Sequence, residues 1–432
     1  MTPYALRRER ALDAFAGGVV IIPGARTMLR NNDTEYEFRQ NSDFFYLTGF
    51  EEPGALLVLA PASSSARATL FLQERDRMRE AWHGRRLGTK RACAALGVDA
   101  AFAIEELDDR LPQLLERAET LYYATGVDAA MDRSIHDALE AARAATRNRG
   151  KAPHTITDPG VVLHRMRAIK SPEEIAILRR SAAATAKGHL AAMAATKPGA
   201  YEYAVEAVLE CAFRQAGAQR LAYESIVAGG DNATVLHYVS NRDVLADGSL
   251  LLVDAAAELD YYATDVTRTW PVNGRFSAEQ RAVYDIVLAA QHAAMEAVAP
   301  GNARNDFNAA AVRKITEGLV ELGALTGGVD ENIERETYRE YYMHGTGHWL
   351  GMDVHDVGPY TRDEEPIRFE PGMVTTVEPG LYFRRDANCD ERLKGIGVRI
   401  EDDVLVTPEG HENLTVMIPK SIAEVEAALQ CA

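Results

Sequence analysis

A single helix start divides this chain of 432 residues into two parts with different patterns. In the segment "IKSPEEIAILRRSAAATAKGHLAAMAA", Ser171 suits the N-cap, Pro172 suits the first helical position and Glu174 completes a capping box. The long helix that follows is rich in alanine and leucine and opens a new domain, so we predict a boundary between residues 168 and 169. A chain of this length has room for about two or three domains of ordinary size.

The two parts predict different fold classes. Before the boundary, apolar segments ("GGVVIIPG", "ALLVLA", "ATLFL", "TLYYA") alternate with helical ones ("AIEELDDRLPQLLERA", "DRSIHDALEAARAAT"), which predicts an α/β domain over residues 1–168. After it, capped helices precede strand pairs, which predicts an α+β domain over residues 169–432 with helices on one face of a sheet. Ser277 with Gln280, and Ser421 with Glu424, are further candidate capping boxes.

Composition excludes several classes of function. The chain is 47% hydrophobic and 26% charged, as in soluble globular proteins, and its net charge of −17 argues against binding to nucleic acids or anionic membranes. No apolar run is long enough to span a bilayer, and the first residues lack the apolar core of a signal peptide. The four cysteines lie far apart without paired spacing, so we expect a reduced, cytoplasmic protein.

Three histidines lie in the glycine-rich stretch "MHGTGHWLGMDVHDVG": His344, His348 and His355. The spacing of the first two matches a zinc-binding H-E-x-x-H helix, but Gly345 and Gly347 would each cost about 1 kcal/mol in a helix. The glutamate of that motif is also missing. Alternate glycines favour an extended or turning backbone that comes close to a bound group. The stretch alone leaves open whether each histidine binds a metal, contacts a substrate or packs in the core.

Two aspartates should face each other across a hairpin. A turn between Leu259 and Asp260 would place Asp254 opposite Asp265, and like charges on paired strands are destabilising. Asp254 also ends an apolar run, where an unpaired carboxylate is costly. Solvated turn residues are the alternative, and we accept it for Asp260. For Asp254 and Asp265 we favour a bound cation that turns the repulsion into binding.

Two glutamates extend this pattern. Glu378 ends the run "MVTTVEPG", and in "GVRIEDDVLV" Glu401 shares one strand face with Arg399. Taken singly, each acid is more often a surface or ion-paired residue than a ligand. Four carboxylates with one histidine nevertheless make an oxygen-rich site for two hard divalent cations, and carboxylate dominance favours Mn²⁺ over Zn²⁺ or Co²⁺. Two such metals would activate a water for hydrolysis.

The full set resembles the five metal ligands of the "pita-bread" dinuclear metallopeptidases: Asp254, Asp265, His348, Glu378 and Glu401. The likeness spans nearly the whole chain and points to the aminopeptidase P (Xaa-Pro aminopeptidase) family of the bacterial cytoplasmic type. "YEFRQNSDFFYLTGFEEPGALLVL" and "AWHGRRLG" resemble its N-terminal domain, whereas "HWLGMDVHDVG", "VEPGLY" and "GIGVRIEDD" resemble its catalytic domain. This implies a creatinase N-terminal-like α/β domain with a role in oligomerisation, followed by an α+β pita-bread domain of the creatinase/aminopeptidase type.

The resemblance also implies a reaction. A metallo-exopeptidase of this kind removes the N-terminal residue from peptides with proline in second position, through a hydroxide that bridges two divalent ions. Asp265 and Glu401 would bridge the metals, Asp254 would complete one shell, and His348 with Glu378 would complete the other. A pocket shaped for the proline ring is needed because the X–Pro bond is a tertiary amide with no N–H.

The remaining implied roles concern substrate and scaffold. His237, in "TVLHYVSNRD", would stabilise the tetrahedral intermediate, while His344 and His355 would line the substrate pocket. The leaving nitrogen would gain its proton from Glu378 or His355. Arg399 would sit behind Glu401 and hold that ligand in place. For His237 and His344, a hydrogen-bonded core histidine is the alternative that the residues alone leave open.

The first domain also carries two implied site residues. Trp82 and Asp33 match residues with which a neighbouring subunit completes the substrate site in this family, so we expect a homodimer or homotetramer. The alternatives are a core tryptophan and an ordinary loop acid. The expected partners are Xaa-Pro peptides, with no nucleic acid and no membrane.

Four other functions remain to be weighed. Prolidase shares the fold and ligands but cleaves Xaa-Pro dipeptides, and the sequence alone separates it poorly. Methionine aminopeptidase usually lacks so large an N-terminal domain. Creatinase and catalytically inactive peptide-binding modules have replaced ligand positions, and all five are intact in this sequence.

Overall fold

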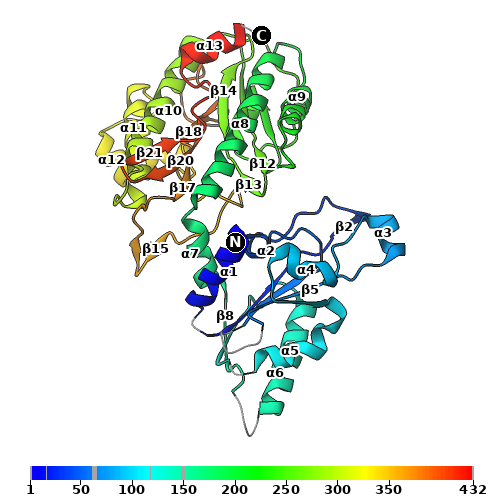
Figure 1. The fold of residues 1–432 in the computed structure, drawn as a ribbon. Helices are drawn as coiled ribbons and strands as arrows, with labels where there is room; N and C mark the ends of the chain where they lie inside the picture. Colours follow the sequence, from blue (N-terminus) through cyan, green and yellow to red (C-terminus); the bar gives the residue numbers. More distant parts are fainter. Residues whose placement is uncertain (1, 16, 61–65, 117, 147–150, 431–432) are drawn as a thin grey trace. The chain divides into compact units, whose positions relative to one another are not determined.

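The computed structural model describes residues 2–15, 17–60, 66–116, 118–146 and 151–430 (Figure 1). Its contacts divide the chain into two compact units, residues 1–165 and 166–432. The predicted boundary between 168 and 169 lies three residues after this division, where helix α7 (Gly160–Ala168) ends. Among the described residues, no helix combines the length and apolar character needed to cross a membrane.

The first unit is built on a mixed six-stranded sheet in the order β6-β5-β4-β1-β7-β8. Its strands are β1 (Val19–Pro23), β4 (Leu56–Leu59), β5 (Ala68–Leu72), β6 (Ala100–Ala103), β7 (Thr120–Tyr122) and β8 (Thr155–Thr157). The inner strands β4 and β5 are buried along their whole length, which explains why they read as continuous apolar runs. Strands β6 and β8 add to the four strands that the sequence pattern predicts.

Helices cover this sheet. In α5 (Leu107–Leu115), Leu107, Leu111 and Leu115 recur every four residues and pack with α6 (Ala129–Thr146) into the core over the sheet. Helices α1 (Pro3–Ala14) and α2 (Ser42–Thr48) pack together, and Figure 1 shows them on the side of the sheet away from α5 and α6. A short hairpin, β2 (Leu29–Asn31) and β3 (Thr34–Glu35), and helices α3 (Arg77–His83) and α4 (Thr89–Leu96) complete the unit.

The second unit begins with the predicted helix. Helix α8 (Pro172–Ala195) starts at Ser171, whose hydroxyl and backbone N–H form the reciprocal capping box with Glu174. The predicted capping boxes at Ser277 and Ser421 are also present, and they open α10 (Ala278–Ala297) and α13 (Ile422–Gln430). The other helices are α9 (Glu202–Gln215), α11 (Arg304–Glu321) and α12 (Val329–Glu334).

The strands of this unit form several small sheets instead of the one sheet that the sequence pattern predicts. The described sheets run β10-β11-β14, β13-β12-β9, β17-β20-β21, β18-β19 and β15-β16. Their bounds are β9 (Arg220–Leu221), β10 (Ile226–Gly229), β11 (Leu250–Asp254), β12 (Ala257–Leu259), β13 (Tyr262–Ala263), β14 (Thr267–Pro271), β15 (Thr361–Arg362), β16 (Glu365–Pro366), β17 (Val374–Val377), β18 (Gly380–Phe383), β19 (Ile396–Arg399), β20 (Asp402–Thr407) and β21 (Gly410–Asn413). The breaks fall at irregular points, among them the Glu378-Pro379 step between β17 and β18, where proline cannot donate to a ladder.

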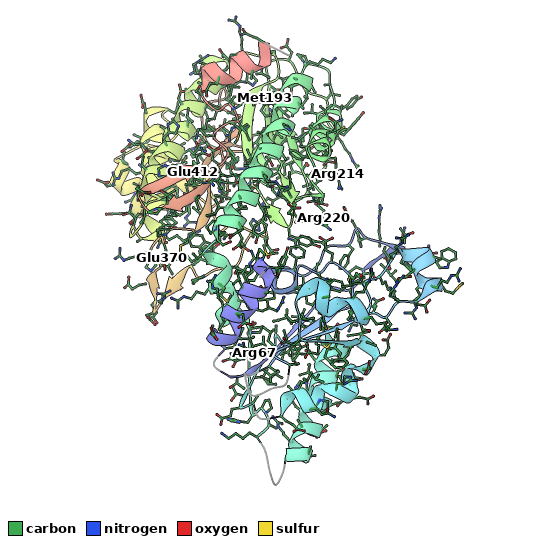
Figure 2. All side chains as sticks on the ribbon, in the orientation of Figure 1. Arg67, Met193, Arg214, Arg220, Glu370 and Glu412 are labelled. Carbon is green, nitrogen blue, oxygen red and sulfur yellow. The ribbon has the colours of Figure 1, made fainter. Side chains whose placement is uncertain are left out.

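The main core of the second unit lies between these strands and two helix pairs. Helix α8 packs on α9 and α10 packs on α11, and Figure 1 shows strands β14 and β18 between the two pairs. Met193, labelled in Figure 2, comes from the last turn of α8 and is fully buried in this core. Arg179 of α8 also forms an ion pair with Glu412 of β21, which connects the helix with the β17-β20-β21 sheet.

Candidate metal centre

The five candidate ligands converge on one cavity of about 540 Å³, and each lies at the end of a strand or in a break between strands. Asp254 is the last residue of β11, Asp265 lies between β13 and β14, and Glu401 lies between β19 and β20. Glu378 directly follows β17, and His348 precedes an isolated bridge that joins Trp349 to Thr375. These irregular positions turn the side chains away from the sheets and into a common space.

The ligand atoms are close enough to share a metal. One ligand atom from each of Asp265, His348 and Glu401 lies within 4.8 Å of the other two. His348 Nε2 is 3.2 Å from Asp265 Oδ2 and 3.4 Å from Glu378 Oε1. The Nδ1–H of His348 donates to the carbonyl oxygen of Trp349 over 3.0 Å, which leaves Nε2 facing the cavity. A protonated Nε2 can donate to Asp265, and the Nε2 of a neutral ring can offer its lone pair to a cation.

The electrostatics of the cluster favour a bound cation. Burial raises the pKa of Asp254, Glu378 and Glu401, and the negative charge of Asp265 raises all three further. Burial alone would lower the pKa of His348, but its hydrogen bond to Asp265 and the charge of Glu378 raise it to about 9. Carboxylates that repel one another in a low-dielectric space are protonated, paired or bound to metal.

Hydrogen bonds from neighbouring side chains hold the carboxylates. Tyr223 donates its hydroxyl to Asp254 Oδ1 over 2.5 Å, and the Thr267 hydroxyl donates to Glu401 Oε2 over 2.6 Å. The buried Asp403 accepts a hydrogen bond from the backbone N–H of Asp265. Sequence reasoning missed Tyr223, Thr267 and Asp403, because a lone polar residue beside an apolar run gives no sign of its partner.

Arg399 contacts a different ligand from the one expected. Its guanidinium donates to Asp254 Oδ2 over 2.6 Å and to the Thr267 hydroxyl over 3.0 Å, so it reaches Glu401 only through Thr267. Arg399 ends β19 and Glu401 lies in the break before β20, so the two do not share a strand face as predicted, and the arginine side chain reaches Asp254 at the end of β11. The prediction that Arg399 sits directly behind Glu401 is therefore wrong, although Arg399 does hold a candidate ligand.

The hairpin register also differs from the prediction. Asp254 pairs with Thr267 rather than with Asp265, because the turn is centred between Asp260 and Tyr261. Both of these residues have positive φ, 50° and 67°, as in a tight two-residue hairpin turn. Asp265 instead lies in the irregular segment between β13 and β14. Asp260 pairs with Arg180 at the surface, in agreement with its expected role outside the site.

The glycine-rich stretch contains no helix, as predicted. Its close approach, however, is to the protein itself: a Cβ at position 347 would lie 2.0 Å from the carbonyl oxygen of Thr376 in β17, whereas a Cβ at position 345 would meet nothing within 4 Å. Gly347 thus allows the segment to pack against a buried strand. The packing fixes the backbone that carries His348.

The histidines line the same cavity in different environments. His344 donates from Nδ1 to the carbonyl of Gly345, and its Nε2 accepts from the hydroxyl of Tyr382, which in turn accepts from Arg399. Burial and the charge of Arg399 lower the pKa of His344 to about 4, so its ring is neutral. The ring of His355 lies 4.4 Å from that of His348, and burial together with that neighbour lowers its pKa.

Trp82 and Asp33 both belong to the first unit. Trp82, in helix α3, is 82% exposed, so it is not the core tryptophan that we considered as the alternative. Asp33 is an exposed residue of the turn between β2 and β3. The residues that line the cavity around the five candidate ligands all come from the second unit.

Comparisons with known proteins agree with this architecture. The family model described as Metallopeptidase family M24 matches residues 176–408, and that described as Aminopeptidase P, N-terminal domain, matches residues 4–123. The chain is 44% identical to the Xaa-Pro aminopeptidase of Escherichia coli over 99% of this chain and 97% of the relative. It is 46% identical to that of Haemophilus influenzae, over 92% and 90%.

Solved structures give the same result. An aminopeptidase from Pseudomonas aeruginosa superposes with a TM-score of 0.97 at 46% identity, covering 99% of this chain and 97% of that one. A zinc-substituted Escherichia coli aminopeptidase P in complex with product has a TM-score of 0.96 at 43% identity, covering 99% and 98%. These matches confirm the predicted fold class, an aminopeptidase P N-terminal domain followed by a pita-bread domain.

Proposed function

Because the chain belongs to metallopeptidase family M24 and is a Xaa-Pro aminopeptidase, we propose that its second unit binds two divalent metal ions through the five residues that converge on the cavity. These residues are Asp254, Asp265, His348, Glu378 and Glu401. The proposal rests mainly on one observation, the approach of Asp265, His348 and Glu401 to within 4.8 Å of one another in a buried cavity. We propose Mn²⁺ as the metal, since carboxylate oxygens dominate the donor set.

The chemistry of the donors fits this assignment. Among the described residues, Arg399 is the one Lys or Arg that forms an ion pair with any of the four carboxylates, and it pairs with Asp254 alone. Asp265, Glu378 and Glu401 have no such partner in the part of the chain that the structure describes, and His348 alone can offset only part of their charge, which favours a bound cation. His348 presents Nε2 to them while its Nδ1–H is held by a backbone carbonyl, an arrangement common in histidine ligands. When bound, the cations lower the pKa of a water and polarise the scissile carbonyl.

We propose the following roles for the chain's own side chains. His237 donates a hydrogen bond to the carbonyl oxygen as negative charge develops there, which stabilises the transition state. His344, neutral and held by Tyr382, contacts the substrate together with His355. The Glu378 carboxyl or an imidazole nitrogen of His355, both of which line the cavity, donates the proton to the leaving imino nitrogen.

The first unit would complete the substrate site of a neighbouring copy. Trp82 is 82% exposed in α3 and Asp33 is exposed in the β2–β3 turn, which supports their contact with another subunit. Met28, Leu29 and Met78 are also more than half exposed in these segments, so the surface has an apolar character typical of an interface. We therefore propose a homodimer or homotetramer. Free thiols at three described cysteines (Cys93, Cys211, Cys389) support our proposal of a reducing, cytoplasmic location.

Peptide hydrolysis with and without metal tests this function. Protein stripped by a chelator is assayed with and without Mn²⁺ on Xaa-Pro-Yaa, Xaa-Pro and Xaa-Ala-Yaa, and release of the N-terminal residue is followed. We expect Mn²⁺-dependent cleavage of Xaa-Pro-Yaa well ahead of the other two peptides. Cleavage confined to Xaa-Pro would indicate a prolidase, an alternative that the match to Xaa-Pro aminopeptidases does not favour. Activity that is insensitive to the chelator and to added metal would contradict the metal assignment.

A further inference from the structure

His237 lies in an active-site loop whose position depends on the backbone. The loop, residues 229–243, starts at Gly229, the last residue of β10, and contains one short 3₁₀ helix, Gly230–Thr234. The His237 ring lines the cavity, is exposed and has no hydrogen-bond partner among the described residues. It nevertheless lies near enough to His344 and His355 for its charge to affect the pKa of each. Its ring is therefore placed by the fold of the loop.

One buried carboxylate ties this loop together from outside the cavity. Glu202, the first residue of α9, is fully buried and accepts four hydrogen bonds. Oε1 accepts from the backbone N–H of Gly229 over 2.8 Å and from the Asn232 side chain over 3.0 Å. Oε2 accepts from the hydroxyl of Tyr238 over 2.8 Å and from the backbone N–H of Asp243 over 2.9 Å. All four donors belong to the loop.

The four donors are spread over the whole loop, from its first residue to its last. Gly229 begins the loop, Asp243 ends it, and Tyr238 is the residue next to His237. No lysine or arginine forms an ion pair with Glu202 among the described residues, so the four donors alone stabilise its buried charge. Both carboxylate oxygens are needed, because each accepts two bonds. A neutral amide at this position could supply only one acceptor oxygen.

Helix capping does not explain the arrangement. A carboxylate in the first turn of a helix commonly accepts a hydrogen bond from that helix, as Glu174 does from the N-cap residue of α8. The carboxylate of Glu202 bonds only to residues of the 229–243 loop. Its role is therefore directed at the loop and not at its own helix.

We propose that Glu202 is a positioning residue that holds the 229–243 loop so that His237 reaches the substrate carbonyl. This inference rests on the proposed function of His237 and adds a residue that does not line the cavity. It implies that Glu202 acts through His237. Weakening the four-bond contact should therefore move the loop and lower turnover, and it should have no further effect once His237 is gone.

The first test reads the loop directly and requires no activity. Hydrogen–deuterium exchange is measured on the whole protein for wild type, Glu202→Gln and the milder Tyr238→Phe, which removes only one of the four donors. We expect faster exchange across 229–243 in Glu202→Gln, a smaller increase in Tyr238→Phe, and little change in α8. Unchanged exchange in the loop of both variants would overturn the proposal.

A matched control separates this effect from the general loss of a hydrogen-bonded carboxylate. Asp132, in the first turn of α6 in the other unit, accepts from the Tyr123 hydroxyl over 2.7 Å and from the backbone N–H of Gly126 over 3.0 Å. Asp132→Asn removes the same kind of contact at a place that does not hold His237. Its exchange in 229–243 and its kcat should match wild type.

The second test is a double-mutant cycle with His237→Ala on an Xaa-Pro-Yaa peptide. We expect Glu202→Gln to lower kcat about 10- to 100-fold with a smaller change in KM, since misplacing a catalytic group by about 1 Å has effects of this size. In the His237→Ala background the same substitution should change kcat less than about twofold. An equal loss in both backgrounds would overturn the proposal.

The two tests also separate this inference from the proposed function. A wild-type protein that cleaves no Xaa-Pro peptide would contradict the function, and the exchange measurement would still decide whether Glu202 holds the loop. Active wild type with an unchanged loop and an additive cycle would contradict only the role of Glu202.

Discussion

Removing one hydroxyl group should weaken metal binding without creating a cavity. Thr267 is fully buried, and its hydroxyl donates to Glu401 Oε2 over 2.6 Å while accepting from Arg399 Nε over 3.0 Å. Thr267→Val keeps the shape of the side chain but breaks both bonds. In the wild type, the Thr267 hydroxyl connects Arg399, which binds Asp254, with Glu401, which we propose bridges the two metals.

The hydrogen bonds that Thr267→Val removes set the expected loss of Mn²⁺ affinity. A hydrogen bond to a charged group contributes about 1.5–3 kcal/mol, and a buried donor left unpaired costs about 1–3 kcal/mol. Loss of a residue that orients a metal ligand typically weakens affinity about 10- to 100-fold, which corresponds to about 1.4–2.8 kcal/mol. We therefore expect the dissociation constant for Mn²⁺ to rise about 10- to 100-fold in Thr267→Val.

The assay is calorimetric titration of chelator-stripped protein with Mn²⁺. Thr267→Ser restores the hydroxyl and should bind close to wild type. Thr269→Val is the matched control, because Thr269 lies two residues further along the same strand and its hydroxyl bonds only to the backbone of Arg399. It should lower thermal stability but change Mn²⁺ affinity less than about twofold. Wild-type affinity in Thr267→Val, or an equal loss in Thr269→Val, would show that the Thr267 hydroxyl does not orient Glu401 for metal binding.

Three further predictions follow from the same geometry. Glu378→Ala should abolish peptide hydrolysis with the fold intact, judged by circular dichroism alongside turnover, and near-full turnover would contradict its role. Gly347→Ala should lower the free energy of unfolding by about 1–3 kcal/mol in urea titrations, because its Cβ would lie 2.0 Å from the carbonyl oxygen of Thr376, whereas Gly345→Ala should have little effect. Burial lowers the pKa of His189 from 6.5 to about 3, so the unfolded chain binds its proton first and stability should fall as pH drops from about 6.5 towards 3. His189→Gln should flatten that slope by up to about 1.4 kcal/mol per pH unit, and identical slopes in denaturation curves at pH 4–6 would show that His189 does not contribute.

The features that the sequence predicted well are those set by local chemistry. Capping boxes start the helices that follow Ser171, Ser277 and Ser421. In each box, a side-chain oxygen accepts from a backbone N–H three residues away, and this spacing can be read directly from the sequence. The rejection of a zinc-binding helix around His344 and His348 rested on the glycines and on the missing glutamate of the motif, and the backbone there is irregular.

The features that were missed depend on residues far apart in the chain. The observed register of the Asp254 hairpin differs from the predicted one because Asp260 and Tyr261, neither of them glycine, both adopt positive φ. Asp254 itself is held by Tyr223 and by Arg399, which lie 31 and 145 residues away in the sequence. Such partners are chosen by tertiary packing, and no spacing rule in the sequence reveals them.

Anomalous X-ray diffraction from protein crystals loaded with Mn²⁺ tests the central claim most directly. We expect two anomalous peaks in the cavity, about 3.5–4 Å apart. Both should contact Asp265 and Glu401, one should contact Asp254, and the other should contact His348 and Glu378. A single peak, or two peaks that share neither Asp265 nor Glu401, would contradict the proposed dinuclear centre.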